Sequence, residues 1–193
     1  MPVVDFLRHG ETTRPDCLNG RSDPPLSDAG WSQIRQQTSG QTWTSIITSP
    51  AQRAAEPARE LSGQSGVALQ TDARWWEMDF GDWDGQSFEA LRADPDASAA
   101  LRVMRAAPHK VTPPNGESWQ TFTDRIREGL LSLDDGALVV CHAGVIRAAM
   151  HVTCGMPLDT LWTFRIGYAA RIRLAYDVQD DALWGEVIEI VQA

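Results

Sequence analysis

The segment that most constrains the fold is residues 3–12, which read Val-Val-Asp-Phe-Leu-Arg-His-Gly-Glu-Thr. Its first five residues are mostly apolar and begin with two β-branched valines, a composition typical of a buried strand. Gly10 predicts a sharp turn directly after that strand. The turn leaves Arg8 and His9 at the end of the strand, which is where α/β sheets bind their ligands.

Apolar, β-branched segments alternate with helical patterns along the rest of the chain. The expected strands are 3–7, 44–48, 67–71, 137–141, 171–176 and 183–191, and the expected helices are 27–37, 49–61, 87–93, 96–105, 117–133 and 145–154. Ser49 and Pro50 have the residue types preferred at the N-cap and first position of a helix, and Gly63 with Gly66 predicts its end. The alternation predicts an α/β fold: a three-layer α/β/α sandwich with a mostly parallel central sheet, in a single domain over residues 1–193.

Composition limits the partners of this domain. A chain of 193 residues with 42% hydrophobic residues can bury a sizeable core, and a net charge of −9 disfavours nucleic acid and anionic membranes as partners. No apolar run approaches the roughly 20 residues of a membrane span, and no signal peptide is visible. Three cysteines without close pairing argue against a disulfide framework or a zinc site. We therefore expect a cytoplasmic protein.

Chemically useful side chains follow the ends of the expected strands. His9, Arg53, Glu77 and His142 each come after one of them, in chain order. If these strands are neighbours, the four groups meet at one edge of the sheet. A helix that begins near Ala143 adds free backbone N–H groups and a positive dipole end, both of which favour an anion.

An imidazole beside a guanidinium suits phosphoryl transfer. The neutral ring nitrogen of His9 can attack phosphorus while Arg8 holds the phosphoryl oxygens through two parallel hydrogen bonds. Taken alone, Arg-His-Gly is equally consistent with a histidine that simply sits in a turn. The remaining blocks of the chain decide between these interpretations.

Six blocks of the sequence resemble the histidine phosphatase superfamily, also called the phosphoglycerate mutase-like family, and they occur in the family's order. The first block is Leu-Arg-His-Gly-Glu-Thr, and the blocks cover residues 7–12, 20–27, 48–54, 77–85, 114–118 and 140–147. One such block is modest support, whereas six in order are specific. The resemblance implies the phosphoglycerate mutase-like version of the predicted fold.

The resemblance also implies a role for each matching residue. His9 is the nucleophile that becomes phosphohistidine, and Glu77 is the general acid that later activates water. Arg8, Arg53 and His142 bind the transferred phosphoryl group. These roles agree with the physical expectation that phosphoryl transfer needs mainly positioning and charge stabilisation. Neither a metal ion nor another cofactor is implied.

The phosphate loop departs from the family pattern. Many mutase-like members have an asparagine six residues after the nucleophile, and here that position is Pro15. The contact is either lost or supplied by Asn19, Arg14 or Arg21. We include Asn19 and Arg21 among the expected substrate-binding residues.

The blocks at 20–23 and 78–85 look most like the α-ribazole phosphatase branch. That branch removes the 5′-phosphate of α-ribazole phosphate during cobalamin nucleotide-loop assembly. A flat heteroaromatic substrate would stack on aromatic walls. The side chains considered for these walls are Trp75, Trp76, Phe80, Trp83 and Trp119. Tryptophans in such a loop are more often core residues than substrate contacts, and Trp83 is the one predicted to bind substrate. Glu117 and Ser118 either line the pocket or cap the long helix.

Several functions fit these residues. The preferred one is a metal-independent phosphomonoester hydrolase that acts on a small molecule. The alternatives are a phosphoglycerate mutase-type phosphotransferase, a broad-specificity sugar or nucleotide phosphatase and a phospho-ligand binder without turnover. Mutases of the family are usually longer and carry a basic insertion, whereas residues 86–110 are short with few cations, which favours hydrolysis. The oligomeric state is open, and a homodimer is one expectation.

Overall fold

The computed structural model describes residues 1–179 and 182–193. A six-stranded sheet with the order β3-β2-β4-β1-β5-β6 forms the centre. The strands are β1 (Val3–Arg8), β2 (Ser45–Thr48), β3 (Leu69–Thr71), β4 (Ala137–Cys141), β5 (Arg171–Gln179) and β6 (Ala182–Val191). β3, β2, β4 and β1 are parallel, and β5 is antiparallel to both β1 and β6. The predicted α/β fold with a mostly parallel sheet is confirmed.

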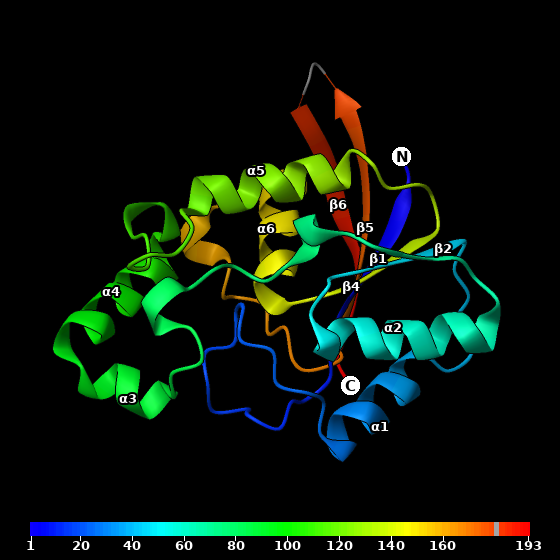
Figure 1. Cartoon of the computed structure of the whole chain (residues 1–193). Coiled ribbons are helices and arrows are strands. Elements are labelled where there is room, and N and C mark those ends of the chain that lie inside the picture. The colour runs from blue at the N-terminus through cyan, green and yellow to red at the C-terminus, as the bar shows by residue number, and fades with distance from the viewer. Residues whose placement is uncertain (180–181) are drawn as a thin grey trace.

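Helices cover both faces of this sheet (Figure 1). The helices are α1 (Asp28–Thr38), α2 (Gln52–Ser65), α3 (Phe88–Ala93), α4 (Pro95–Ala106), α5 (Trp119–Leu130) and α6 (Ala143–Cys154). Because successive strand residues point to opposite faces, Phe6 packs in the core under α5 and α6 while Leu7 packs in the core under α1 and α2. None of the helices in the described residues is both long and apolar enough to span a membrane.

The register of the parallel strands brings their carboxyl ends level. Arg8 is opposite Cys141 in the β1–β4 pair, and Thr48 is opposite Val140 in the β2–β4 pair. Two further backbone bonds extend this alignment, from His9 N to Cys141 O and from Ser49 N to Val140 O, at 2.9 and 3.0 Å. The residues that follow the three strands therefore emerge side by side.

The start and end of α2 differ from the prediction. The helix begins at Gln52 and not at Ser49–Pro50, because the carboxylate of Asp23 reaches in from another loop and accepts from Gln52 N at 2.7 Å. Its end is also later, since Gly63 is helical and the chain leaves the helix at Gly66 with φ 71°. That conformation is left-handed, which glycine adopts at little cost.

Two other helices differ at their starts. α5 begins at Trp119 with Ser118 as its N-cap, whose hydroxyl accepts from Thr121 N at 3.0 Å. Ser118 therefore caps the helix, which resolves one of the open alternatives. α6 begins at Ala143, two residues before the range 145–154 but at the residue where the anion-binding helix start was expected, with His142 in the N-cap position.

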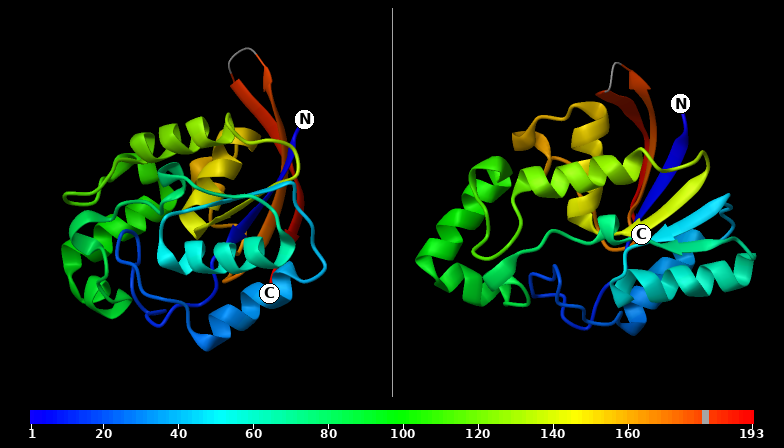
Figure 2. Two further views of the ribbon diagram at one scale, coloured as in Figure 1. Left: turned by 45° about the vertical axis from the view of Figure 1, so that its right-hand side comes forward. Right: turned by 45° about the horizontal axis from the view of Figure 1, so that its top comes forward.

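α3 and α4 lie apart from the three layers. Figure 2 shows them beyond the end of α5, joined to the sheet by extended connections. The described residues also form four single-turn 3-10 helices, η1 (Ala73–Trp75), η2 (Gly81–Trp83), η3 (Pro108–Lys110) and η4 (Leu158–Thr160). The last turns of α4 contact both η3 and η4, so this excursion forms a wall beside the strand ends.

Candidate active site

His9 is held as one defined tautomer. Its Nδ1 lies 2.7 Å from the carbonyl oxygen of Gly10, which can only accept a hydrogen bond, so Nδ1 carries the proton and Nε2 the lone pair. The side chain is buried. Burial, together with the charges of Arg8 and Arg53, holds the pKa of His9 well below its ordinary value near 6.5. A neutral nucleophile is therefore available at neutral pH.

Arg8 is fixed on the opposite side of the same strand end. Its Nη1 donates to the carbonyl of Ile166 at 2.8 Å, and its guanidinium carbon lies 4.1 Å from the ring centroid of Tyr168. A guanidinium stacked on an aromatic face is restricted to one plane. The Tyr168 ring is also 5.9 Å from the ring of His9, so one aromatic side chain orients both residues.

Arg53 is fully buried, and its guanidinium hydrogen-bonds to the loop formed by residues 19–23. Its Nη1 donates to Ser22 O at 2.8 Å and to Asp23 Oδ1 at 3.0 Å. Its Nη2 donates to Gly20 O and Asn19 O at 2.8 and 3.2 Å. These bonds fold residues 19–23 around the guanidinium.

His142 approaches His9 from the neighbouring strand, with 5.3 Å between the ring centroids. Its Nε2 lies 2.8 Å from the hydroxyl of Ser49, which itself accepts from Ala51 N at 3.3 Å. The Ser49 hydroxyl can then donate to Nε2, which leaves the proton of His142 on Nδ1. Burial, followed by the charges of Arg53, His9 and Arg8, holds the pKa of His142 well below its usual value.

Three buried nitrogens in this cluster have no partner among the described residues: Arg8 Nε, Arg53 Nε and His142 Nδ1. A buried donor left unbonded costs about 1–3 kcal/mol, so native proteins rarely leave several together. Such donors around the His9 ring would be satisfied by an oxyanion. The arrangement is chemically suited to a phosphoryl group.

Glu77 is fixed by backbone donors at the mouth of this cluster. Its Oε2 accepts from Gly144 N and its Oε1 from Met78 N, both at 3.0 Å. A Cβ atom at Gly144 would lie 2.2 Å from Glu77 Oε1, so only glycine leaves room for the acid there. Arg125 supports the loop from behind by donating to Glu77 O at 3.1 Å.

The N-terminus of α6 holds an acid of the protein itself. The N–H of Gly144 donates to the Glu77 carboxylate, whereas the expected ligand anion at this helix start stays a prediction. Ala143 lines the cavity beside it. The helix start therefore positions the acid.

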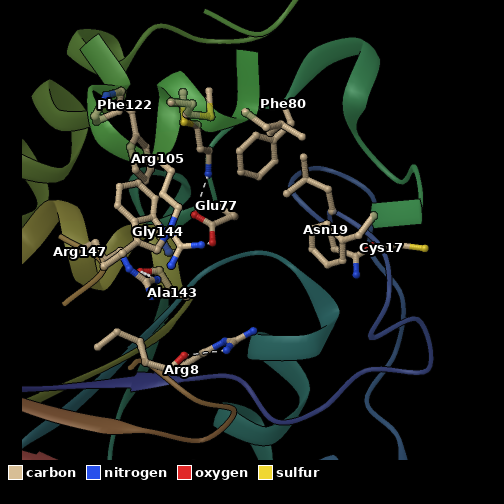
Figure 3. A pocket seen from close by; sticks show the side chains of 18 of the residues that line it. Arg8, Cys17, Asn19, Glu77, Phe80, Arg105, Phe122, Ala143, Gly144 and Arg147 are labelled. Atoms are coloured by element: carbon tan, nitrogen blue, oxygen red, sulfur yellow. Dashed lines mark hydrogen bonds between the residues drawn. The ribbon is translucent and has the colours of Figure 1, made fainter. Parts of the chain in front are cut away.

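A cavity of about 580 Å³ opens above these residues and is lined by Arg8, His9 and Glu77. Six aromatic side chains contribute to its walls: Phe80, Phe88, Trp119, Phe122, Trp162 and Tyr168. Figure 3 shows Glu77 between Arg105 and Arg147 on one side and Phe80 and Asn19 on the other, with Arg8 beneath. The volume suits a ligand larger than a simple phosphate ester of two or three carbons.

The structure brings most of the predicted site residues together. Arg8, His9, Asn19, Glu77 and Ala143 line the cavity, while Arg53 and His142 lie fully buried behind its floor. The amide nitrogen of Asn19 donates to Arg14 O at 2.9 Å, and Pro15 is also part of the lining.

Two predicted substrate-binding residues lie elsewhere. The guanidinium of Arg21 stacks on Trp76 with 5.1 Å to the ring centroid and pairs with Asp79 at 3.7 Å, away from the cavity. Trp83 is 8% exposed and belongs to the core, as does Trp75. Loop tryptophans are often core residues because burying their large apolar surface stabilises the fold.

Other contributors were missing from the sequence-based set. Tyr168 precedes β5 and carries no motif that would mark it. Arg147 stands in the last matching block and could have been singled out there. Residues 86–110 are poor in cations by count, yet three of their arginines line the cavity: Arg92, Arg102 and Arg105. That placement removes much of the sequence-based reason for preferring hydrolysis over mutase chemistry.

Comparisons with known proteins agree with this geometry. The sequence model of the histidine phosphatase superfamily (branch 1) matches residues 4–184. The adenosylcobalamin/alpha-ribazole phosphatase of Escherichia coli (strain K12) is 28% identical over 171 residues, covering 83% of each chain. The glucosyl-3-phosphoglycerate phosphatase of Mycolicibacterium vanbaalenii is 30% identical over 206 residues, covering 96% of this chain and 89% of the relative. A solved mycobacterial glucosyl-3-phosphoglycerate phosphatase complexed with VO3 superposes with a TM-score of 0.87 at 22% identity, over 98% of both chains.

Proposed function

The chain belongs to the histidine phosphatase superfamily and is a phosphatase; from that premise we propose that it hydrolyses phosphomonoesters through a phosphohistidine at Nε2 of His9. In the first step the Nε2–P bond forms as the P–O bond to the leaving group breaks, and Glu77 gives that oxygen a proton. In the second step Glu77 takes a proton from water, the new P–O bond forms, and the Nε2–P bond breaks. Inorganic phosphate leaves, and His9 is regenerated.

One observation carries this proposal: three unpartnered buried nitrogens surround a histidine held with its lone pair on Nε2. Donors placed where charge develops contribute most of the electrostatic stabilisation of a phosphoryl transition state. Arg8 and Arg53 supply charge, and His142 supplies a neutral donor. Glu77 lies in the cavity lining, where a leaving-group oxygen would emerge.

We propose α-ribazole 5′-phosphate as the first substrate to test. Aromatic walls formed by Phe80, Trp119 and Trp162 suit a flat heteroaromatic body, and relatives named as alpha-ribazole phosphatases support the choice. A cobalamin role follows only if that substrate is correct. As alternatives we propose a broad-specificity sugar or nucleotide phosphatase and, as a second reaction of the same phosphohistidine, phosphoglycerate mutase-type phosphotransfer.

Rapid quench with a ³²P-labelled phosphomonoester tests the covalent step. We expect an acid-labile, base-stable label that maps to His9 and that disappears in His9→Asn. His142→Asn is the matched control, since it removes a neighbouring histidine that is proposed to donate to the phosphoryl group without bonding to phosphorus. In this variant the label should still map to His9. Label on His142, or no label in a quench that catches the burst, would contradict the mechanism.

The remaining expectations stay proposals as well. We expect turnover to continue after exhaustive treatment with EDTA, since no step above uses a metal ion. The cytoplasmic location and the homodimer are testable by cell fractionation and by light scattering on the purified protein.

A further inference from the structure

The cavity is strongly cationic in a protein that is acidic overall. The chain has 26 acidic residues against 17 lysines and arginines. Among the described residues, however, the cavity lining holds one carboxylate, that of Glu77, and five arginines: Arg8, Arg92, Arg102, Arg105 and Arg147. Such a reversal of charge concentrates anions locally against the field of the whole protein.

A single phosphoryl group accounts for only part of this charge. Arg8 lies beside His9, and Arg53 lies behind the floor, so the two can serve one phosphoryl dianion. Arg105 on α4 and Arg147 on α6 belong to a different wall, where Figure 3 shows them together beside Glu77. They are in excess of what the transferred group requires.

The two guanidinium groups are available to a ligand. Arg147 donates to the carbonyls of Leu161 and Ala143, both at 3.2 Å, and its guanidinium stacks at 5.5 Å from the Trp162 ring centroid. These are neutral partners, so its charge is not balanced by a salt bridge. Arg105 is exposed, and in the part of the chain that the structure describes it makes no ion pair.

The electrostatics of Arg147 agree with a site that attracts an anion. Burial lowers the pKa of Arg147 to about 10, with further contributions from the like charges of Arg8 and Arg105 and an opposing one from Glu77. The group remains a cation at neutral pH. Asp159 lines a separate hollow outside the cavity, together with Arg102, Arg105 and Trp162.

We propose that Arg105 and Arg147 form a second anion site, which binds a carboxylate carried by the leaving group of a mid-sized phosphomonoester. The inference rests on the proposed phosphatase function but not on α-ribazole 5′-phosphate, which has no carboxylate. It names a different substrate class: aromatic or extended phosphate esters that also bear a carboxylate. Trp162 lies against the Arg147 guanidinium, so an aromatic body and its carboxylate can be held on the same wall. Arginine suits this task because its planar fork matches a carboxylate.

A matched pair of substrates tests the site. 3-Carboxyphenyl phosphate and 3-carbamoylphenyl phosphate have nearly the same shape, but only the first is anionic at the substituent. We expect kcat/KM for the carboxylate to exceed that for the amide by about fivefold at low ionic strength, the upper range for partly exposed ion pairs. The 4-substituted pair, measured in the same way, reports how far the site lies from phosphorus.

Variants then assign the preference to its residues. In Arg105→Gln the ratio of the two kcat/KM values should fall towards one, and Arg147→Lys should reduce it in part, since a lysine keeps the charge but not the fork. Arg59→Gln is the matched control, because Arg59 is an exposed arginine on α2 outside the cavity. It should keep the wild-type ratio.

The outcomes separate this inference from the proposed function. A ratio near one in the wild-type protein at both ring positions, or a preference that survives Arg105→Gln unchanged, would overturn the second anion site. Phosphohistidine formation with the amide substrate would in either case report on the phosphatase mechanism alone. A preference that falls equally in Arg59→Gln would show only the effect of net charge and would also overturn the site.

Discussion

The floor of the cavity and its outer wall are built in different ways. Here the floor means Arg8, His9 and Glu77 together with Arg53 and His142 buried behind them. Each of these side chains hydrogen-bonds to backbone groups or to a residue that is itself fixed. On the outer wall, arginines from α3 and α4 are exposed and make no ion pairs within the described residues. A rigid floor suits one chemical step, whereas a wall of long side chains suits selection among leaving groups.

The largest effect should come from disturbing the acid on the floor. Glu77→Gln removes the proton donor, and the expected loss of kcat is about 10²–10⁴-fold for alkyl phosphates but smaller for phenyl phosphates, whose leaving groups need less help. Gly144→Ala should produce a weaker version of the same pattern, because the new Cβ would displace the Glu77 carboxylate. Steady-state kinetics on both ester classes measure the difference. Equal losses on alkyl and phenyl esters would contradict the role of Glu77 as the acid.

The floor could be predicted from the sequence because its reactive side chains directly follow strands that the apolar pattern identifies. His9 and His142 directly follow buried strands, and the register of β1 and β4 places them side by side. Arg53 lies in the first turn of α2, directly after β2, which pairs with β4. Its position beside the two histidines therefore also follows from the order of the strands.

The outer wall could not be predicted, because its residues lie on an excursion whose placement depends on packing. Trp83 and Phe80 are three residues apart in one loop, yet Trp83 is in the core and Phe80 lines the cavity. No spacing rule distinguishes the two faces of an irregular loop. Tyr168 contacts Arg8 and His9 from a connection far along the chain, where only the folded structure brings them together.

Acid should destabilise the protein through the floor. His9 and His142 have lowered pKa values in the folded state, so the unfolded chain takes up protons from about pH 6.5 downward while the folded protein does not. Stability is therefore complete above about pH 6.5 and falls as the pH drops below it, by up to about 1.4 kcal/mol per pH unit for each histidine.

Urea unfolding at pH 7.5, 6.0 and 5.0 measures this dependence. His9→Asn should have a shallower acid-side slope, because one of the two groups no longer titrates. Gln41→Asn is the control, since Gln41 is exposed and has no titratable side chain, so this variant should leave the slope unchanged. An unchanged slope in His9→Asn would contradict the buried, neutral state of that histidine.

Selectivity among substrates should be a smaller effect, set by the wall. We expect kcat/KM for α-ribazole 5′-phosphate to exceed that for glucose 6-phosphate by about tenfold, because stacking on an aromatic face contributes about 0.5–1.5 kcal/mol. Trp162→Leu should reduce this ratio while leaving the phosphohistidine step in place. If sugar phosphates match α-ribazole 5′-phosphate within twofold, the aromatic wall does not select the leaving group, and a broad-specificity phosphatase is the better description.

The smallest effect on catalysis should come from replacing Arg21. This residue belongs to the same loop as the Arg53 partners but lies outside the cavity. Both Arg21 and Arg53 were predicted to bind phosphate, but Arg53 is buried with its Nε facing no partner, whereas Arg21 is exposed and engaged with Trp76 and Asp79. Arg21→Ala should change kcat/KM by no more than about twofold, since an exposed ion pair is worth at most about 1 kcal/mol and this one lies outside the cavity. Arg53→Lys keeps the charge but loses the fork that orders residues 19–23, so it should lower kcat/KM far more. A loss above tenfold in Arg21→Ala would mean that the loop rearranges around substrate and that the floor extends further than its hydrogen bonds indicate.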